Sequence, residues 1–186
     1  NTAELSFTPP NTSGVLVDLS AAVLLSVTPP TNSTYKTGQH LDFIANFAGN
    51  VNVTGIPRIQ LQIGNETVYA NLHTGSGTQA LTFRYTVQSG DIDADGMGHL
   101  GPIELNGASM VDDSGNAATL NFTPENTPGV LVDGINVSIA SVTPPANKTY
   151  GIGEIINYTV NYDHPASVGG QPRIQLTLGA ATVYAN

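Results

Sequence analysis

The chain has 186 residues and no cysteine, so any domain that it forms must be held by a noncovalent core and not by disulfides. Acidic residues outnumber basic ones by 14 to 5, and the formal net charge of −9 makes nucleic acids and anionic membranes poor partners for its surface. No apolar run approaches the roughly 18 residues that a membrane-spanning helix needs, so membrane insertion is not expected.

A tandem repeat dominates the sequence. When residues 1–71 are compared with residues 116–186, at a constant offset of 115 and without gaps, 36 of the 71 pairs are identical. The stretch GVLVDLSAAVLLSVTPPTNSTY, residues 14–35, returns as GVLVDGINVSIASVTPPANKTY, residues 129–150. A period this long lets each copy bury its own core, so we expect separate domains in a row and not the stacked layers of a solenoid.

The repeat also predicts the domain boundaries. Residues 1–18 match residues 116–133 and are expected to be the C-terminal strand or strands of a preceding module. Residues 19–133 are expected to form one complete module, and residues 134–186 the N-terminal half of a following one. The sequence is therefore predicted to be a segment of a longer array. The alternative is a protein whose incomplete modules are completed by neighbouring copies.

Alternation of apolar and polar residues predicts short strands and no helix. Leu41, Phe43, Ala45 and Phe47 are expected to share one face of a strand, and Ile59, Leu61 and Ile63 are expected to point inward from another. The strand in which Leu81, Phe83, Tyr85 and Val87 share one face is expected to be the longest and to lie centrally in a sheet. Residues 31–38 are expected to be a turn and residues 89–99 an acidic loop. The expected strands are Val23–Val27, His40–Phe47, Pro57–Ile63, Thr67–Leu72, Leu81–Val87, Ile103–Val111 and Gly129–Asp133. Seven short strands that follow one another along the sequence without a helical pattern predict an all-β domain, a β-sandwich.

Several segments, in their order, resemble a known family. SVTPPANKTY opens the module, PRIQLTLGAATVYA lies in its middle, LTFRYTVQSGDIDADG follows, and DDSGNAATL and VLVD close it. This order is similar to the tandem bacterial immunoglobulin-like (cadherin-like) repeats of giant secreted surface adhesins of the RTX type. The resemblance implies an all-β fold of tandem immunoglobulin-like β-sandwiches. It also implies an extracellular or cell-surface rod, active in cell adhesion and biofilms, with calcium stiffening its joints.

The stretch Asp91-Ile92-Asp93-Ala94-Asp95-Gly96 is a candidate calcium loop. Alternating carboxylates on a flexible turn supply the hard oxygen ligands that Ca²⁺ prefers, and the glycine allows a sharp turn. The stretch is not an EF-hand, because Pro102 stands where the bidentate glutamate of such a loop belongs. The alternative is a solvated acidic turn.

A second acidic group is expected at the joints between modules. Asp112 and Asp113 begin the turn DDSGN, whose residue types are also those that a tight turn needs for its own backbone. Asp18 and Asp133 close successive copies, and Asp133 is expected to lie near the acidic loop and to face the DDSGN turn of the next copy. Gly134 would leave that linker flexible unless a cation is bound. The candidate calcium ligands are therefore Asp18, Asp91, Asp93, Asp95, Asp112, Asp113 and Asp133.

Eight Asn-X-Ser/Thr triplets make N-glycosylation a further possibility in a host that carries the machinery. Threonine-rich strands and asparagine-rich turns also produce such triplets by chance. The asparagines concerned are Asn11, Asn32, Asn52, Asn65, Asn121, Asn136, Asn147 and Asn157.

Nothing in the sequence indicates catalysis. The copy replaces His40 by Ile155 and has His164 where the first copy has Gly49, so neither histidine is a property of the repeat. We therefore expect no enzymatic activity.

Functions of different classes remain open. The first is a structural spacer whose partners are neighbouring copies of the same module. The second is a carbohydrate- or cell-surface-binding module, and the third is a subunit of a filament completed by strand exchange. The repeat favours the spacer, because the loops are rich in Gly, Ser, Asn and Asp while the aromatic residues fall at expected core positions.

Overall fold

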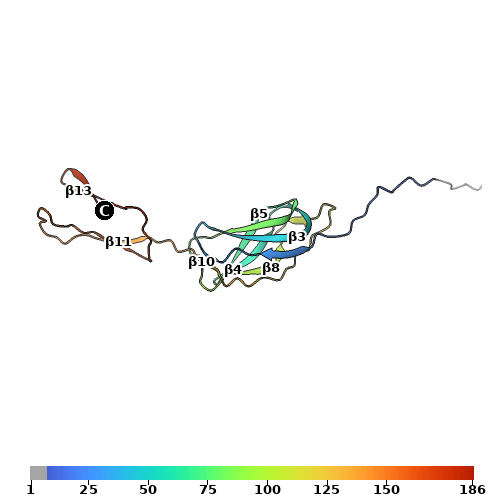
Figure 1. Cartoon of the computed structure of the whole chain (residues 1–186), viewed down its shortest axis with the longest axis horizontal. Helices are drawn as coiled ribbons and strands as arrows, with labels where there is room; N and C mark the ends of the chain where they lie inside the picture. The colour runs from blue at the N-terminus through green and yellow to red at the C-terminus, as the bar shows by residue number, and fades with distance from the viewer. Residues whose placement is uncertain (1–7) are drawn as a thin grey trace, which may run out of the picture. The chain divides into compact units, whose positions relative to one another are not determined.

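The computed structural model describes residues 8–186, and these form strands, turns and loops without any helix (Figure 1). Accordingly, no described residue belongs to a helix that could cross a membrane. The chain divides into two compact units, of which the first ends at Gly134 and the second spans Ile135–Asn186. This division lies one residue after Asp133. The expected segment 1–18 is described only from residue 8 onward.

The first unit contains two sheets. The larger sheet has the order β1-β3-β6-β5-β4-β8 with antiparallel neighbours throughout, and β9 pairs with the end of β3. Its strands are β1 (Leu24–Thr28), β3 (His40–Thr54), β4 (Arg58–Ile63), β5 (Glu66–Thr74), β6 (Thr78–Thr86), β8 (Gly98–Glu104) and β9 (Ser109–Val111). The smaller sheet has the order β2-β10-β7, with β2 (Ser33–Lys36), β7 (Ile92–Asp93) and β10 (Val130–Asp133).

Both sheets contribute to a single apolar core. The faces predicted from alternation are confirmed: Leu41, Phe43, Ala45 and Phe47 of β3 are buried together with Ile59, Leu61 and Ile63 of β4. Val130 and Val132 of β10 belong to the same buried cluster, although they lie in the smaller sheet. An all-β domain with two sheets around one core is the sandwich-like architecture that the strand spacing predicts.

Several details of the strand prediction are wrong. The longest strand is β3, with 15 residues, whereas β6 has 9 and lies between β3 and β5 as expected for a central strand. The strands β2 and β7 form where a turn and an acidic loop were expected, because each finds a partner in β10. The broken strand expected at 103–111 is divided between β8 and β9 by a turn in which Asn106 has a φ of 50°.

The second unit contains two hairpin-like pairs. β11 (Ile139–Thr143) pairs with β12 (Thr159–Tyr162), and β13 (Ile174–Leu178) pairs with β14 (Ala181–Ala185). Each pairing reproduces that of the first unit at an offset of 115. The β11–β12 register matches β1–β3, including the same irregularity after the first pair, and the β13–β14 register matches β4–β5.

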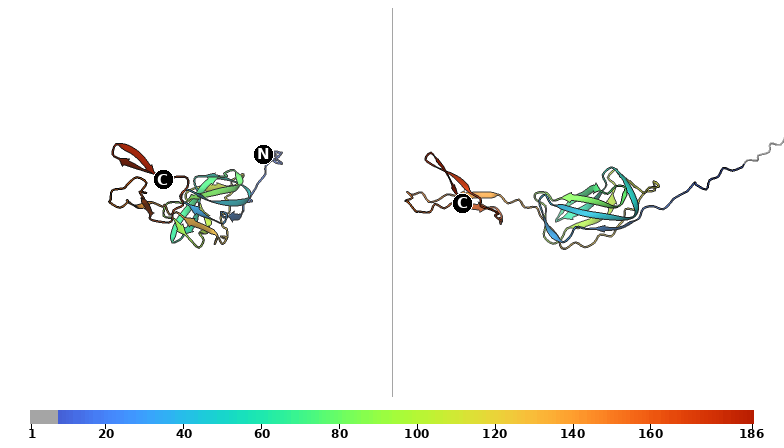
Figure 2. Two further views of the ribbon diagram at one scale, coloured as in Figure 1. Left: turned by 60° about the vertical axis from the view of Figure 1, so that its left-hand side comes forward. Right: turned by 45° about the horizontal axis from the view of Figure 1, so that its top comes forward.

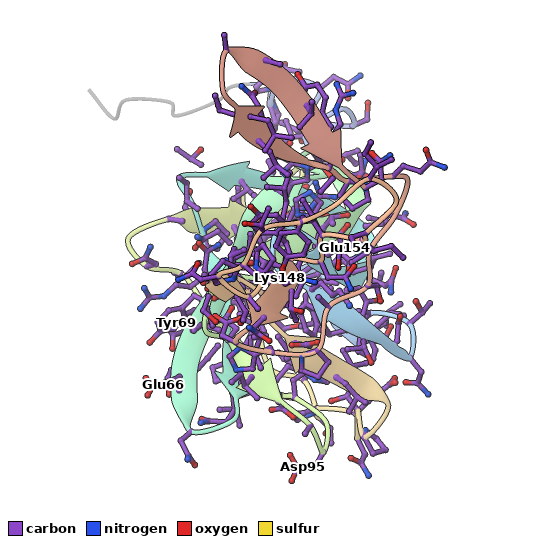
Figure 3. All side chains as sticks on the ribbon, turned by 90° about the vertical axis from the view of Figure 1, so that its left-hand side faces the viewer. Glu66, Tyr69, Asp95, Lys148 and Glu154 are labelled. Atoms are coloured by element: carbon purple, nitrogen blue, oxygen red, sulfur yellow. The ribbon has the colours of Figure 1, made fainter. Side chains whose placement is uncertain are left out.

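Side-chain contacts recur at the same offset. The hydroxyl of Tyr35 donates to the carbonyl of Thr31 at 2.9 Å, and that of Tyr150 donates to the carbonyl of Ala146 at 2.9 Å. The guanidinium of Arg58 lies 3.7 Å from the ring centroid of Tyr69, and that of Arg173 lies over Tyr184 in the same way. Tyr69 is labelled in Figure 3. Similar local sequence therefore produces the same strand pairing and the same side-chain contacts in both units.

The two units differ in burial. Leu61 in β4 is fully buried, whereas its counterpart Leu176 in β13 is only half-buried. β8, which pairs with β4 in the first unit, and β6, which pairs with β5, have no counterparts among the described residues of the second unit.

This matched pair of leucines provides a test of where the stability resides. Leu61→Ala is expected to lower the free energy of unfolding of the first unit by about 2–5 kcal/mol, because it opens a cavity in a closed core. Leu176→Ala is expected to cost less than about 1 kcal/mol, because its site is already open to water. Both free energies can be measured by urea unfolding, with the NMR amide signals of each unit as the probe. Equal losses at the two positions would show that burial does not decide where the stability resides.

Candidate functional site

The acidic loop lies beside the strand that closes the first unit. β7 is antiparallel to β10, with Asp93 opposite Val132 and Ile92 opposite Asp133. The carboxylates of the loop and of Asp133 therefore occupy one end of the unit, the end at which the chain leaves it after β10 (Figure 1).

Asp91 serves as an acceptor within its own turn. Its Oδ2 accepts hydrogen bonds from the hydroxyl of Tyr85 at 2.8 Å and from the backbone N–H of Gln88 at 2.7 Å. Burial of the phenol and its bond to this carboxylate raise the pKa of Tyr85 well above its ordinary value. The carboxylate therefore ties the end of β6 to the start of the loop.

Asp93 faces the interior and not the solvent. It is 5% exposed, and its two oxygens accept backbone hydrogen bonds from Gly64 at 2.7 Å and from Gly96 at 2.8 Å. One carboxylate thereby joins the β4–β5 turn to the acidic loop. Asp95 is exposed, and Figure 3 shows it at the rim of the molecule, directed outward. The three aspartates thus point in different directions and have different surroundings.

No group of three or more Asp, Glu or His side chains within residues 8–186 is arranged to hold a metal ion. Carboxylate oxygens are the right donors for Ca²⁺, but both oxygens of Asp93 already hold backbone N–H groups. Asp93 thus serves the fold of the loop in this structure, and calcium binding at this end stays a prediction.

Gly134 is fixed in place, contrary to its expected role as a flexible residue. Its N–H donates to the carbonyl of Asp91 at 2.7 Å, and its own carbonyl accepts from the N–H of Gly90 and the hydroxyl of Thr37. A Cβ at this position would lie 2.3 Å from the carbonyl oxygen of Gln88. Close backbone packing, and not freedom of rotation, explains the glycine here.

The DDSGN turn lies at the opposite end of the first unit and is held by its first residue. Oδ1 of Asp112 accepts from the N–H groups of Ser114 at 2.9 Å and Asn116 at 2.8 Å. Gly115 has a φ of 87°, the left-handed conformation that closes such a turn. These hydrogen bonds show that the residues of the turn satisfy the turn's own backbone, as their types led us to expect.

Three candidate carboxylates gather at this turn. Asp18, Asp112 and Asp113 line one open hollow, together with Asn50 and Ser114. Oδ2 of Asp18 accepts from the hydroxyl of Ser114 at 3.0 Å. Asp113 accepts from the side-chain amides of Asn50 at 3.0 Å and of Asn52. The structure therefore brings Asp18 close to Asp112 and Asp113, the acids that were expected to meet where one copy follows another.

All eight sequon asparagines are exposed. They occupy loops, turns and strand ends, and some are engaged: the amide of Asn52 donates to Asp113 at 2.8 Å, and Oδ1 of Asn11 accepts from the N–H of Ser13 at 2.9 Å. Gly129 packs against the side chain of another of these asparagines, Asn32, because a Cβ at position 129 would lie 2.5 Å from its Cγ. Glycosylation of the eight stays a prediction.

His99 is a buried polar residue whose importance the sequence did not indicate. Its ring is 2% exposed and lies between Phe43 and Phe122, with ring centroids 5.3 Å and 5.9 Å away. Nε2 accepts from the N–H of Glu125 at 3.3 Å, while Nδ1 has no hydrogen-bond partner among the described residues. Only its place in β8 could have indicated burial, because Ile103 of the same strand also faces the core.

Asp93 is expected to be the aspartate of the acidic loop on which stability depends most. Asp93→Ala leaves the N–H groups of Gly64 and Gly96 without their acceptor and should lower the free energy of unfolding by about 2–4 kcal/mol. Asp95→Ala, the matched control, should change it by less than about 0.5 kcal/mol. Urea unfolding in EDTA measures both without any contribution from cations. Equal effects of the two variants would show that Asp93 does not act as this backbone acceptor.

His99 is expected to make the fold acid-sensitive. Burial lowers the pKa of His99, and the nearby carboxylate of Glu125 opposes that shift. Below a pH of about 6.5 the unfolded chain then binds a proton that the folded chain does not, so stability falls as pH falls toward the lowered folded pKa. This contribution approaches about 1.4 kcal/mol per pH unit.

Two histidine variants test whether His99 causes this pH dependence of stability. His99→Phe keeps an aromatic ring between Phe43 and Phe122 and should remove this part of the pH dependence, whereas the exposed His73→Gln should leave it unchanged. Melting temperatures measured between pH 5 and 8 provide the comparison. A pH profile that is the same in the wild type and His99→Phe would contradict the assignment.

Comparison of the chain with protein-family models and with curated proteins gives no match.

Proposed function

We propose that the chain is part of a structural extender of a large extracellular adhesin or surface fibre, which holds a binding region away from the cell. The observation that carries this proposal is the path of the chain through the first unit. The chain enters at β1 at one end and leaves after β10 at the opposite end (Figures 1 and 2). Units with this path add length when they are connected in series.

The proposed module is an immunoglobulin-like sandwich. The parallel pairing of β10 with β2, next to antiparallel sheets, supports it, because the last strand is thereby held against the first part of the chain. The aromatic residues support a spacer over a carbohydrate-binding module. Phe43, Phe47 and Phe83 are buried in the core, where they cannot stack on a sugar.

Calcium is proposed to stiffen the joints between copies. Asp91, Asp95 and Asp133 lie at the end where one copy finishes, and the DDSGN acids lie at the end where a copy begins. When two copies follow one another, Asp91 and Asp95 of the first would approach the DDSGN acids of the next and repel them unless a cation lies between them. Millimolar extracellular Ca²⁺ suffices for a site of modest affinity. Asp93 would hold the loop in place through Gly64 and Gly96.

Solution scattering tests the extender. Proteins that contain one, two and three copies of residues 19–133 are expected to grow in maximum dimension by a constant increment of about 40 Å per copy, since each unit adds the length of its strands. EDTA is expected to shorten the two- and three-copy proteins and to lower their melting temperatures, while the single copy keeps its dimension.

The two parts of this proposal fail separately. A maximum dimension that does not increase with copy number would contradict the extender. If EDTA leaves both the dimension and the melting temperature of the two-copy protein unchanged, calcium is not part of the joint, and the acidic loop is only a soluble turn.

A further inference from the structure

The chain does not enter the first unit as a free linker. The side chain and the carbonyl of Asp18 accept hydrogen bonds from the hydroxyl of Ser114 at 3.0 Å and the side-chain amide of Asn116 at 3.1 Å. Further along, the carbonyl of Ala22 accepts from the N–H of Thr119 at 3.0 Å, and the hydroxyl of Thr119 accepts from the N–H of Leu24 at 2.9 Å. Residues 18–24 are therefore fastened along residues 114–119.

The surface that receives Asp18 is rigid. Asp112 holds the turn from inside through the N–H groups of Ser114 and Asn116, and its Oδ2 accepts from the side-chain amide of Asn116 at 3.0 Å. The same amide thus donates to Asp112 and to the carbonyl of Asp18. Asp113 binds the turn to β3 by accepting from Asn50 and Asn52. The two donors that reach Asp18 therefore have fixed positions relative to the sandwich.

The internal repeat shows which residue of the segment is preserved. Residues 14–18 are identical to residues 129–133, and the identity stops there, because none of residues 19–25 equals its counterpart in 134–140. The aspartate is the same in both copies, whereas the residues that follow it differ. Pairing in β10 accounts for the preceding valines, since Val130 and Val132 are buried in the core.

We propose that the DDSGN turn, Asp112–Asn116, is a docking site for Asp18, the closing residue of the preceding repeat, and that this contact fixes the direction in which that repeat enters the module. The inference rests on the proposed extender and specifies what sets the angle of its joints. The partner is another copy of the same module, recognised through one carboxylate and one carbonyl. Because the donors are neutral, this contact itself requires no cation, and the proposed calcium would act on Asp91 and Asp95 of the preceding copy, which are not part of the contact.

The electrostatics of the site account for the choice of donors. Asp112 and Asp113 lie close to Asp18, and three carboxylates in one hollow repel each other. The N–H of Ser20, at 2.9 Å from Oδ1, and the hydroxyl of Ser114 stabilise the charge of Asp18, and they hold its pKa below the ordinary value. Asp112 and Asp113 are in turn occupied by donors of the turn and of β3.

Distances between two spin labels measure the direction of the segment. The chain contains no cysteine, so Leu16→Cys and Gln79→Cys, both at exposed positions, introduce the only two labels. The 186-residue chain is expected to give a narrow distance distribution in EDTA. Ser114→Asp should broaden it by about a factor of two, since the hydroxyl donor to Asp18 is then replaced by a carboxylate that repels it. Adding Asp18→Asn should restore the narrow distribution, because an amide at position 18 donates to that new carboxylate.

Ser109→Asp is the matched control. It adds the same charge at an exposed serine of β9 and should leave the distribution narrow, and the melting temperature of each variant reports whether the fold is intact. A distribution that is broad in the wild type, or one that Ser114→Asp does not broaden, overturns the docking site. A distribution that is broad in EDTA and narrow only with Ca²⁺ also overturns it, in favour of a cation at the joint. None of these outcomes affects the length increment that tests the extender.

Discussion

The pairing of β10 with two other strands is the interaction on which the rest of the module depends. β10 is parallel to β2 and antiparallel to β7, and its valines complete the core. It therefore connects the last residues of the module to its beginning and to the acidic loop. Both short strands exist only because β10 is present, since neither carries an apolar alternation of its own. Asp133, the last residue of β10, is thereby placed at one end of the sandwich.

The acidic residues divide into those that hold the fold and those that remain for a joint. Asp93 and Asp112 are acceptors for backbone N–H groups in two turns at opposite ends of the unit. Asp95 is exposed, and Asp18 contacts the DDSGN turn from outside. Clustering of carboxylates in the sequence thus has two separate causes. Tight turns need short acceptors, and the proposed joints between copies would use the carboxylates at the ends of a unit.

The two units separate local from tertiary effects, because the same residues occur in both. The hairpin of β4 and β5 and that of β13 and β14 share register and the stacking of an arginine on a tyrosine. Burial differs, since Leu61 is closed off from water while Leu176 is only half-buried. Strand pairing and turn chemistry are therefore properties of the local sequence, whereas the stabilisation that comes from the core requires the strands that follow.

The sequence by itself determined the offset of the repeat, the all-β class and the buried faces of β3 and β4, because alternation with a period of two is a local property of the chain. Only the tertiary structure decided four features: that β2 and β7 are strands, that Asp93 points inward, that Gly134 is fixed and that His99 is buried. Each depends on a partner distant in the sequence, such as β10 for β7 or Phe122 for His99. The identity of such partners follows from the way the sheets close around the core, which no local pattern encodes.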